Sequence, residues 1–442
     1  MSHSRAFKIL LIAAFGASVF SVAMAQERTA PAIGPSPNLH QPQKSWLPTI
    51  SWAPVEPWPE GRKPKAAQGL AVNAFAQGLK HPRWIYVLPN GDVLVAESAS
   101  EPSPAWSPRA LIQNYVQRRV RATVENANRI SLLRDKDGDG VAEERTVFLE
   151  GLRQPFGMAL IGDKFYVGNT DSVVVYPYKE GDTRITAQGQ KLMDLKVGHH
   201  WTRNILPSRD GTKLYVTVGS FSNIAEKGIE EEEGRAAIHE LDLATNKSRI
   251  FAGGLRNPNG MDFEPQTGVL WTVVNERDEL GDELPPDYMT SVKDGGFYGW
   301  PYSYWGKHVD TRVKPERPDL VEKSITPDYA LGGHTAALGL TFDEQSALPA
   351  PYKGGAFVGM HGSWNRSDPS GYSVIFIAFK DGKPQGMPVD VLSGFLVEDG
   401  SKAHGRPVGV TFDRKGALLV ADDAGDSIWR VTGAQGVSRV SN

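Results

Sequence analysis

The sequence predicts an all-β fold, a six-bladed β-propeller with an N-terminal proline-rich arm and a short helical insertion. Its 442 residues include 46 glycines, 31 prolines and 11 tryptophans, which favours many short strands and turns over helices. From residue 79 onward, an apolar strand, a polar turn and a second β-prone strand recur six times. A unit of roughly 40–75 residues with this content is typical of a propeller blade.

Each of the six copies is expected to supply the two inner strands of a four-stranded blade. The copies lie at 84–96, 157–167, 204–217, 260–273, 339–359 and 409–421. Outer strands are expected at 171–176, 237–241 and 427–431. A pair of β-sandwiches would not explain an Asp-Gly or Asn-Gly turn that recurs at the same place in successive units.

Residues 1–25 have the pattern of a secretory signal peptide. Arg5 and Lys8 precede an apolar run over 9–22, and Ala23-Met24-Ala25 forms an A-x-A cleavage site. The apolar run is short for a membrane span, and no later segment is apolar enough to cross a bilayer. We expect export to the periplasm or outside the cell, with cleavage after Ala25 and no stable membrane insertion. An uncleaved anchor is the alternative.

Three further segments complete the predicted organisation. Residues 26–69, with nine prolines between Pro31 and Pro64, cannot build a core and form either a disordered leader or an arm whose tryptophans lie on the main domain. Residues 70–433 form the propeller, and 434–442 a C-terminal tail. Between the first two blades, Ser107-Pro108 and the apolar spacing up to Arg121 predict a helix, with a basic face, that covers the side of the propeller.

Composition excludes several classes of function. The net charge is −3, with 48 basic and 51 acidic residues, so no bulk electrostatic case exists for a nucleic-acid or membrane partner. Cysteine is absent, which excludes disulfides, thiolate nucleophiles and cysteine-bound metals. The chain has no G-x-G-x-x-G, P-loop or G-x-S-x-G element, which disfavours Rossmann-type nicotinamide binding and serine-hydrolase chemistry.

An Asp/Gly-rich turn matches the first half of an EF-hand loop. Asp135, Asp137 and Asp139 occupy positions 1, 3 and 5, and Gly140 occupies position 6. Position 12 is Thr146 instead of a bidentate Glu, and the flanking residues look like strands. Two interpretations stay open: a hairpin turn held by Ca²⁺, or an ordinary Asp/Gly turn. In both interpretations the turn has a structural role.

Several polar residues fall in loops that lead into the innermost strands, where propeller sites form. They are His199, Arg256, His334 and Arg406. The adjacent His199 and His200 are expected to enter a strand and therefore to point to opposite faces, one packed and the other facing the central channel. A neutral histidine in the channel would be a candidate general base near pH 7. Two hydrogen-bonded structural histidines are the alternative.

These residues carry a resemblance to a known family. The Arg256-Asn257-Pro258-Asn259-Gly260 turn, the acidic loop 275–283, the Gly296–Pro301 run and the segment 199–219 together resemble the glucose/sorbosone dehydrogenase family, most closely its L-sorbosone dehydrogenase branch. The similarity covers about residues 70–433. Members of this family are soluble six-bladed propellers that use pyrroloquinoline quinone (PQQ).

The resemblance implies that the chain oxidises a sugar or aldehyde by hydride transfer to PQQ and passes electrons to an external quinone, dye or cytochrome. It implies His199 as general base, with His200 as the substitute, and Arg256 with Ca²⁺ to polarise the quinone carbonyl. Calcium would be bound by Arg277 and Asp278. The implied cofactor contacts are Gln154, Asn257, Asn259, His334, Arg366 and Arg406.

The chain departs from the family pattern in ways that bear on cofactor binding. Val408 stands where relatives have a second clamp arginine, and Gly409 stands where an Asp is expected. The lysine of the fifth blade is absent, and Arg366 is its expected replacement. Because PQQ carries three carboxylates, fewer cationic partners should weaken its binding. The alternatives to a PQQ dehydrogenase are a PQQ-free relative, a Ca²⁺-dependent propeller lactonase and a non-enzymatic binding module.

Overall fold

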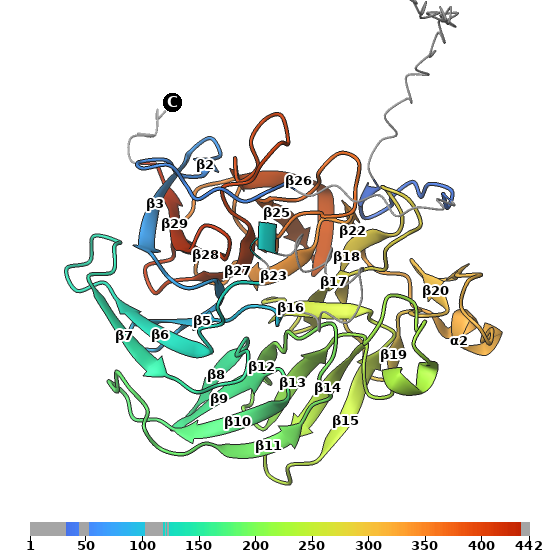
Figure 1. The fold of residues 1–442 in the computed structure, drawn as a ribbon, viewed down its shortest axis with the longest axis horizontal. Helices are drawn as coiled ribbons and strands as arrows, with labels where there is room; N and C mark the ends of the chain where they lie inside the picture. The colour runs from blue at the N-terminus through green and yellow to red at the C-terminus, as the bar shows by residue number, and fades with distance from the viewer. Residues whose placement is uncertain (1–31, 44–52, 102–117, 120, 122, 435–442) are drawn as a thin grey trace, which may run out of the picture. The chain divides into compact units, whose positions relative to one another are not determined.

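Six sheets, antiparallel except for one short added strand, follow one another along the chain and surround a common centre (Figure 1). The computed structural model describes residues 32–43, 53–101, 118–119, 121 and 123–434, all of which belong to one compact unit. The predicted signal peptide, residues 435–442 of the tail and most of the predicted helix 107–121 lie outside the described residues.

The blades have four strands each, in chain order from the inside outward. The first has β4 (Pro82–Val87), β5 (Val93–Glu97), β6 (Arg129–Arg134) and β7 (Glu144–Leu149); the second has β8 (Met158–Ile161), β9 (Lys164–Asn169), β10 (Ser172–Pro177) and β11 (Gln190–Asp194). The third has β12 (Ile205–Pro207), β13 (Lys213–Val218), β14 (Ala237–Asp242) and β15 (Ser248–Gly253), extended by β19 (Gly296–Phe297).

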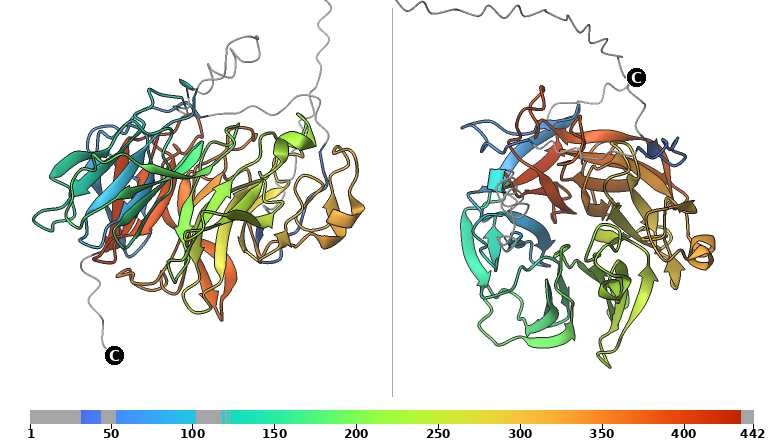
Figure 2. Two further views of the ribbon diagram at one scale, coloured as in Figure 1. Left: turned by 90° about the horizontal axis from the view of Figure 1, so that it is seen from below. Right: turned by 45° about the vertical axis from the view of Figure 1, so that its right-hand side comes forward.

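The remaining three blades repeat this order. The fourth has β16 (Asn257–Phe263), β17 (Leu270–Asn275), β18 (Pro286–Ser291) and β22 (Tyr329–Gly333); the fifth has β23 (Ala337–Phe342), β24 (Gly355–Met360), β25 (Ser373–Lys380) and β26 (Lys383–Ser393). The sixth combines β27 (Pro407–Phe412), β28 (Leu418–Asp422) and β29 (Ser427–Gly433) with β3 (Leu70–Gln77). All six predicted repeats supply inner strands, and the six-bladed propeller is confirmed. The colours of Figure 2 follow the chain around the ring.

The ring closes by pairing strands from opposite ends of the described chain. β3 pairs antiparallel with β29, and the register runs from Gln77 opposite Ser427 to Leu70 opposite Gly433. The first blade therefore packs against a sixth blade whose outer strand precedes it in sequence. β3 and β29, which come from opposite ends of the described chain, therefore both have a partner in the sixth blade.

Parts of the proline-rich segment lie along the blades as short edge strands. β1 (Ile33–Gly34) pairs with β22, and β2 (Lys65–Ala66) pairs with β26. Trp58 packs edge-on against Trp429 at a centroid distance of 5.5 Å. Its indole N–H donates a 2.8 Å hydrogen bond to the fully buried carboxylate of Asp422. Trp46 and Trp52 lie outside the described residues.

Helix is scarce in the part of the chain that the structure describes. It contains the helix α2 (Pro318–Lys323) and the 3₁₀ turn η1 (Ile229–Glu232) as named elements, beside a hairpin of β20 (Ser303–Tyr304) and β21 (His308–Val309). Among these described residues, no helix has the length and apolar character needed to cross a membrane.

Close backbone contact near the centre explains two of the glycines. A Cβ at Gly339 or Gly359 would collide with the carbonyl oxygen of Val408, so only glycine lets β23 and β24 approach β27 this closely.

The antiparallel order of the strands places two sets of loops at one end of the blades: those entering each innermost strand, and those joining each second strand to the third. We call this end the mouth.

Candidate functional site

The carboxylate of Asp278, in the β17–β18 loop, lies at the centre of a polar cluster in the mouth. Its Oδ1 accepts a 2.6 Å hydrogen bond from the amide of Asn365 and lies 3.4 Å from Nδ1 of His334. Its Oδ2 lies 3.6 Å from a guanidinium nitrogen of Arg256. Burial alone would raise the pKa of Asp278, but the hydrogen bond from His334 and the charge of Arg256 outweigh it and hold that pKa well below its usual range.

His334 is the complementary partner of this carboxylate. Its Nε2 lies 2.9 Å from the carbonyl oxygen of Gly281, so each ring nitrogen faces an oxygen acceptor. Burial would lower the pKa of His334, but the adjacent Asp278 outweighs burial and raises it. The protonated ring can donate from both nitrogens. When His334 is protonated, it forms an ion pair with Asp278 between the fourth blade and the loop entering the fifth.

Arg256 precedes β16, and hydrogen bonds hold its guanidinium in place. Its Nη1 donates to the carbonyl oxygen of Glu276 at 2.6 Å, and its Nη2 donates to Oδ1 of Asn223 at 3.1 Å. The same Asn223 oxygen accepts the backbone N–H of Asp278 at 2.9 Å. Asn223 is therefore a shared support that the sequence patterns did not indicate, because a lone asparagine in a loop has no distinguishing spacing.

The two histidines lie in the loop before β12, and their predicted orientation is wrong. Their rings contact each other edge to face at a centroid distance of 4.8 Å, because this segment is not the extended strand that would send them to opposite faces. Nδ1 of His200 lies 2.8 Å from the carbonyl oxygen of Ser220. That contact assigns the Nδ1–H tautomer and leaves Nε2 as the basic nitrogen.

The electrostatic surroundings keep both of these imidazoles neutral near pH 7. Burial, followed by the charge of Arg256, lowers the pKa of His200 well below its usual value. His199 is an exposed residue, and desolvation, followed by the charge of Arg256, lowers its pKa as well. Each ring can therefore accept a proton.

Asn257 and Asn259 differ in what they can offer a ligand. The amide oxygen of Asn257 is buried and has no hydrogen-bond partner among the described residues. Asn259 is fully buried and satisfied: its Oδ1 accepts from Thr202 Oγ1 at 2.7 Å, and its amide donates to the Asn257 carbonyl at 3.1 Å. The oxygen of Asn257 thus has unused hydrogen-bonding capacity, whereas the amide of Asn259 is satisfied.

Two of the residues expected to contact the cofactor, Gln154 and Arg366, bind partners within the protein instead. Gln154 is 3% exposed, and its amide donates to the carbonyl oxygen of Ala99 at 2.8 Å. Arg366 forms an ion pair with Glu283 and donates to the carbonyl oxygen of Gly333 at 3.2 Å. Both side chains thus have partners within the protein, while Nε of Arg366 has none among the described residues.

Arg406 fastens the loop between β24 and β25. Its Nε donates to the carbonyl oxygen of His361 at 3.0 Å and its Nη2 to that of Gly362 at 2.6 Å. The departure at Val408 has a clear structural basis. Val408 is fully buried in an apolar cluster with Trp84, where a second arginine would have no counter-charge.

A second buried cluster, which the sequence patterns did not indicate, lies where the first, fifth and sixth blades meet. Asp423 accepts from Nε2 of His361 at 2.9 Å, lies 3.3 Å from Nε2 of His81, and is paired with Arg83. Burial lowers the pKa of His361 to about 3 and that of His81 to about 4, in spite of the carboxylate. The partners come from segments far apart in sequence, so no local motif marks them.

The two groups of residues predicted to bind calcium lie at opposite ends of the blades. Oxygens of Asp135, Asp137, Asp139 and Glu143 all lie within 4.8 Å of one another in the β6–β7 loop, at the end of the blades away from the mouth. The ammonium of Lys415 lies 3.2 Å from one Asp135 oxygen. At the mouth, the Arg277 side chain is buried and paired with Asp310, so only the backbone of Arg277 is left for a metal.

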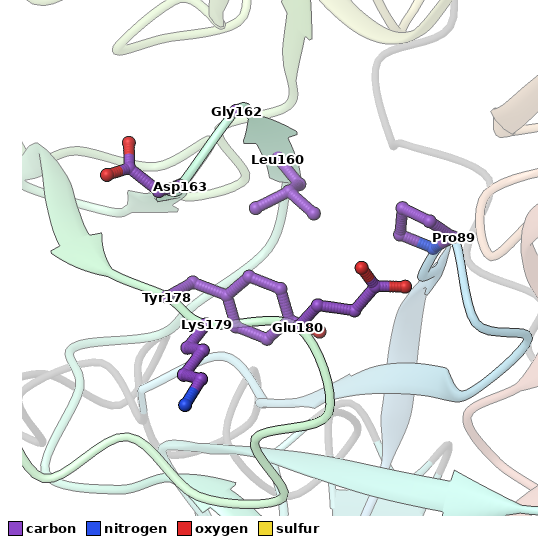
Figure 3. A pocket seen from close by; sticks show the side chains of 7 residues that line it. All are labelled: Pro89, Leu160, Gly162, Asp163, Tyr178, Lys179 and Glu180. Atoms are coloured by element: carbon purple, nitrogen blue, oxygen red, sulfur yellow. The ribbon is translucent and has the colours of Figure 1, made fainter.

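Two cavities lie away from Asp278. One of about 470 Å³ lies at the end opposite the mouth, between turns of the first two blades, and Figure 3 shows its lining residues Pro89, Leu160, Gly162, Asp163, Tyr178, Lys179 and Glu180. The other, of about 240 Å³, adjoins the mouth and is lined in part by Arg235, Gly254, Phe297, Trp300 and Tyr302. The indole N–H of Trp300 donates to the carbonyl oxygen of Asn223 at 2.9 Å, which connects this cavity wall to the support of Arg256.

Comparison with known proteins agrees with this architecture. The profile of the family described as TrAA12-like matches residues 116–293 and 318–434. An uncharacterized protein of Borreliella burgdorferi is 30% identical over 294 residues, covering 63% of this chain and 76% of that protein. A pyrroloquinoline quinone-dependent pyranose dehydrogenase of Coprinopsis cinerea is 24% identical over 223 residues, which cover 40% of this chain and 30% of the dehydrogenase. A calcium structure of the Trichoderma reesei enzyme of carbohydrate-active family AA12 superposes with a TM-score of 0.69 at 19% identity, covering 88% of this chain and all of that one.

Proposed function

Because the chain belongs to the TrAA12-like family, we propose that it is an exported PQQ-dependent oxidoreductase that oxidises a sugar or aldehyde at the mouth of the propeller. Within that class we propose an aldose or sorbosone type of substrate and an external quinone, dye or cytochrome as electron acceptor. The observation that carries the proposal is the convergence of Arg256, His334 and Asp278 beside two neutral histidines.

The donor set at the mouth fits PQQ, a planar tricarboxylate. Arg256 supplies positive charge, His334 adds to it when protonated, and the unpartnered amide oxygen of Asn257 can accept a hydrogen bond from the ligand. Arg406 adds a further guanidinium on the same end of the blades. When bound, PQQ would supply the two-electron acceptor that the side chains themselves lack.

The histidine pair supplies the base for this reaction. We propose that His199, which is exposed at the mouth, accepts the proton of the substrate hydroxyl through a ring nitrogen. His200, with Nδ1–H donating to Ser220 and Nε2 basic, packs against His199 and is the substitute base. Burial, followed by the charge of Arg256, keeps the pKa of both rings low, so the neutral, proton-accepting form is available at neutral pH.

For the metal of this site, we propose that Ca²⁺ is held by the backbone oxygens of Arg277 and Asp278, with the Asp278 carboxylate as a further ligand. Hard oxygen donors of this kind are what Ca²⁺ prefers. In the described structure the carboxylate is balanced by Arg256 and His334, so a calcium ion would compete with His334 for it.

Reconstitution tests the function directly. Purified protein is mixed with PQQ and Ca²⁺, and dye reduction is followed with aldoses, sorbosone and simple alcohols, while cofactor binding is followed by absorbance. We expect binding of PQQ and reduction of the dye with at least one sugar or aldehyde, and both should weaken in Arg256→Ala. The absence of both would refute the dehydrogenase, and hydrolysis of a lactone without PQQ would identify a lactonase instead.

A further inference from the structure

Glu232 is a buried acidic residue at the end of η1, in the β13–β14 loop at the mouth. Its Oε2 accepts the backbone N–H of Phe221 at 2.7 Å, and its Oε1 accepts the backbone N–H of Ser222 at 3.0 Å. The same Oε1 also accepts the hydroxyl of Ser222. Three hydrogen bonds to one side chain therefore join the two halves of this loop.

The three donors require a carboxylate at position 232. A carboxylate has two accepting oxygens and can take both backbone N–H groups at once. A glutamine amide has one oxygen, so its NH₂ group would face one of these N–H groups and leave a buried donor without an acceptor. The adjacent Glu231 is exposed, so the same substitution at position 231 removes a charge in solvent.

The turn that Glu232 holds determines the tautomer of His200. The hydroxyl of Ser220 donates to the carbonyl oxygen of Ser222 at 2.7 Å. Because its proton is used there, the hydroxyl oxygen can only accept from Nδ1 of His200, which lies 3.1 Å away and also 2.8 Å from the Ser220 carbonyl oxygen. Two acceptors thus face Nδ1, which must carry the proton and leaves Nε2 as the basic nitrogen.

The same turn also holds Arg256. Asn223 directly follows Ser222, and its Oδ1 accepts Nη2 of Arg256 at 3.1 Å. The backbone N–H of Ser220 donates to the carbonyl oxygen of Arg256 at 2.8 Å. A shift of residues 220–223 would therefore move a guanidinium and an imidazole of the mouth together.

We propose that Glu232 is a positioning residue of this site: by holding residues 220–223, it fixes the Nδ1–H tautomer of His200 and the place of the Arg256 guanidinium. It acts through Ser220 and Asn223. This inference rests on the proposed function, because it concerns groups assigned to that reaction. A displacement of about 1 Å in a reacting group can cost about 10²-fold in rate, so such a residue governs turnover through its neighbours.

Nitrogen-15 NMR of the PQQ-free protein tests this inference without any turnover. In the wild type, His200 should show a single Nδ1–H tautomer, and the amides of Phe221 and Ser222 should exchange slowly with solvent. In Glu232→Gln, both tautomers should appear, and the two amides should exchange about tenfold faster, as expected when a hydrogen bond to a charged group is lost. Glu231→Gln is the matched control and should give the wild-type result.

A second variant decides the matter if Glu232→Gln does not fold, which circular dichroism detects. Ser222→Ala removes one of the three hydrogen bonds to Glu232 and should give an intermediate result, with faster exchange at both amides and a minor second tautomer. Wild-type exchange and a single tautomer in every folded variant would overturn the inference, and so would equal changes in Glu231→Gln.

Kinetics of the PQQ-loaded protein separate this inference from the proposed function. The kcat of Glu232→Gln should fall about 10²-fold, that of Ser222→Ala should fall less, and that of Glu231→Gln should not change. If the wild type reduces no dye, the dehydrogenase fails, and the NMR results still decide whether Glu232 fixes His200. An unchanged kcat in Glu232→Gln would overturn its positioning role.

Discussion

The side-chain amide of Asn365 donates a 2.6 Å hydrogen bond to the carboxylate of Asp278, and so joins the fifth blade to the fourth across the mouth. The same carboxylate faces Arg256 and His334. One anionic side chain therefore orients a guanidinium, an imidazole and a loop at once. This relationship makes the geometry of the mouth depend on a contact between residues that are 87 positions apart.

Removing the amide of Asn365 should loosen the loop between β24 and β25 without unfolding the propeller. Asn365→Ala loses a hydrogen bond to a charged, partly exposed carboxylate, so we expect the free energy of unfolding to fall by about 1–2 kcal/mol. Urea unfolding measures this change. Gln385→Ala, which removes an exposed amide bonded to Lys383 of the same strand, is the control and should cost much less. Equal losses in both variants would contradict a special role for the Asn365–Asp278 bond.

The pKa of His334 should depend on Asp278. In the wild type the carboxylate raises that pKa above 6.5, so the stability from this pair is fully present below pH 6.5 and is lost as pH rises through the folded-state pKa. In Asp278→Asn, burial is no longer opposed by the carboxylate charge, and the pKa of His334 should drop below 6.5. NMR titration of the histidine ring protons measures both values.

His239 provides an internal reference for that titration. Burial lowers its pKa, and its Nε2 faces the carbonyl of Gly234, remote in sequence from the acidic loop. Its titration should be the same in wild type and Asp278→Asn. A His334 pKa that stays above 6.5 in the variant would show that another group holds its proton.

His199→Ala should lower kcat by about 10²–10⁴-fold, the usual contribution of a general base, while PQQ and Ca²⁺ still bind. The base must be neutral, and its pKa is lowered below 6.5, so kcat/KM should rise with pH along an acid limb that lies below pH 6.5. Stopped-flow reduction of the loaded enzyme measures both. His308→Ala, on the β20–β21 hairpin, should behave as wild type.

If His200→Ala, and not His199→Ala, abolishes turnover, the two roles are reversed. Such a result would agree with the tautomer that Ser220 fixes on His200. Loss of folding in His199→Ala, detected by circular dichroism, would instead assign that residue a structural function.

Calcium should stabilise the β6–β7 loop independently of the mouth. A ligand that binds only the folded state at a hundredfold excess over its Kd adds about 2.7 kcal/mol, so the Tm should rise when Ca²⁺ replaces EDTA. Asp137→Ala should remove the part of the shift due to this loop, because its carboxylate belongs to the oxygen cluster with Asp135 and Asp139. Differential scanning calorimetry measures the shift.

A substitution at Asp278 distinguishes the proposed calcium site at the mouth from the one in the β6–β7 loop. Asp278→Ala should keep the shift that depends on Asp137 and abolish the Ca²⁺ dependence of dye reduction. If Asp137→Ala leaves the whole thermal shift intact, the loop is an ordinary Asp/Gly turn held by Lys415. If Asp278→Ala leaves activity equally dependent on Ca²⁺, the proposed position at Arg277 and Asp278 is wrong.

The sequence by itself determined the fold, because its signals are local. Alternating apolar residues and Asp-Gly or Asn-Gly turns specify strands and hairpins within each repeat, and six repeats specify six blades. The same order also indicated that Arg256, His334 and Arg406 enter innermost strands, which places them at one end of the blades. The departure at Val408 was visible in the sequence, and its burial among apolar neighbours explains it.

Only the tertiary structure decided which side chains meet. Asn223, Asn365 and Asp278 come from three blades, and the cluster around Asp423 joins the first, fifth and sixth. It also decided that Gln154 and Arg366 bind internal partners and that His199 and His200 touch. The physical reason is that a hydrogen bond requires atoms within about 3 Å, and loop conformation and ring closure set such distances between segments far apart in sequence.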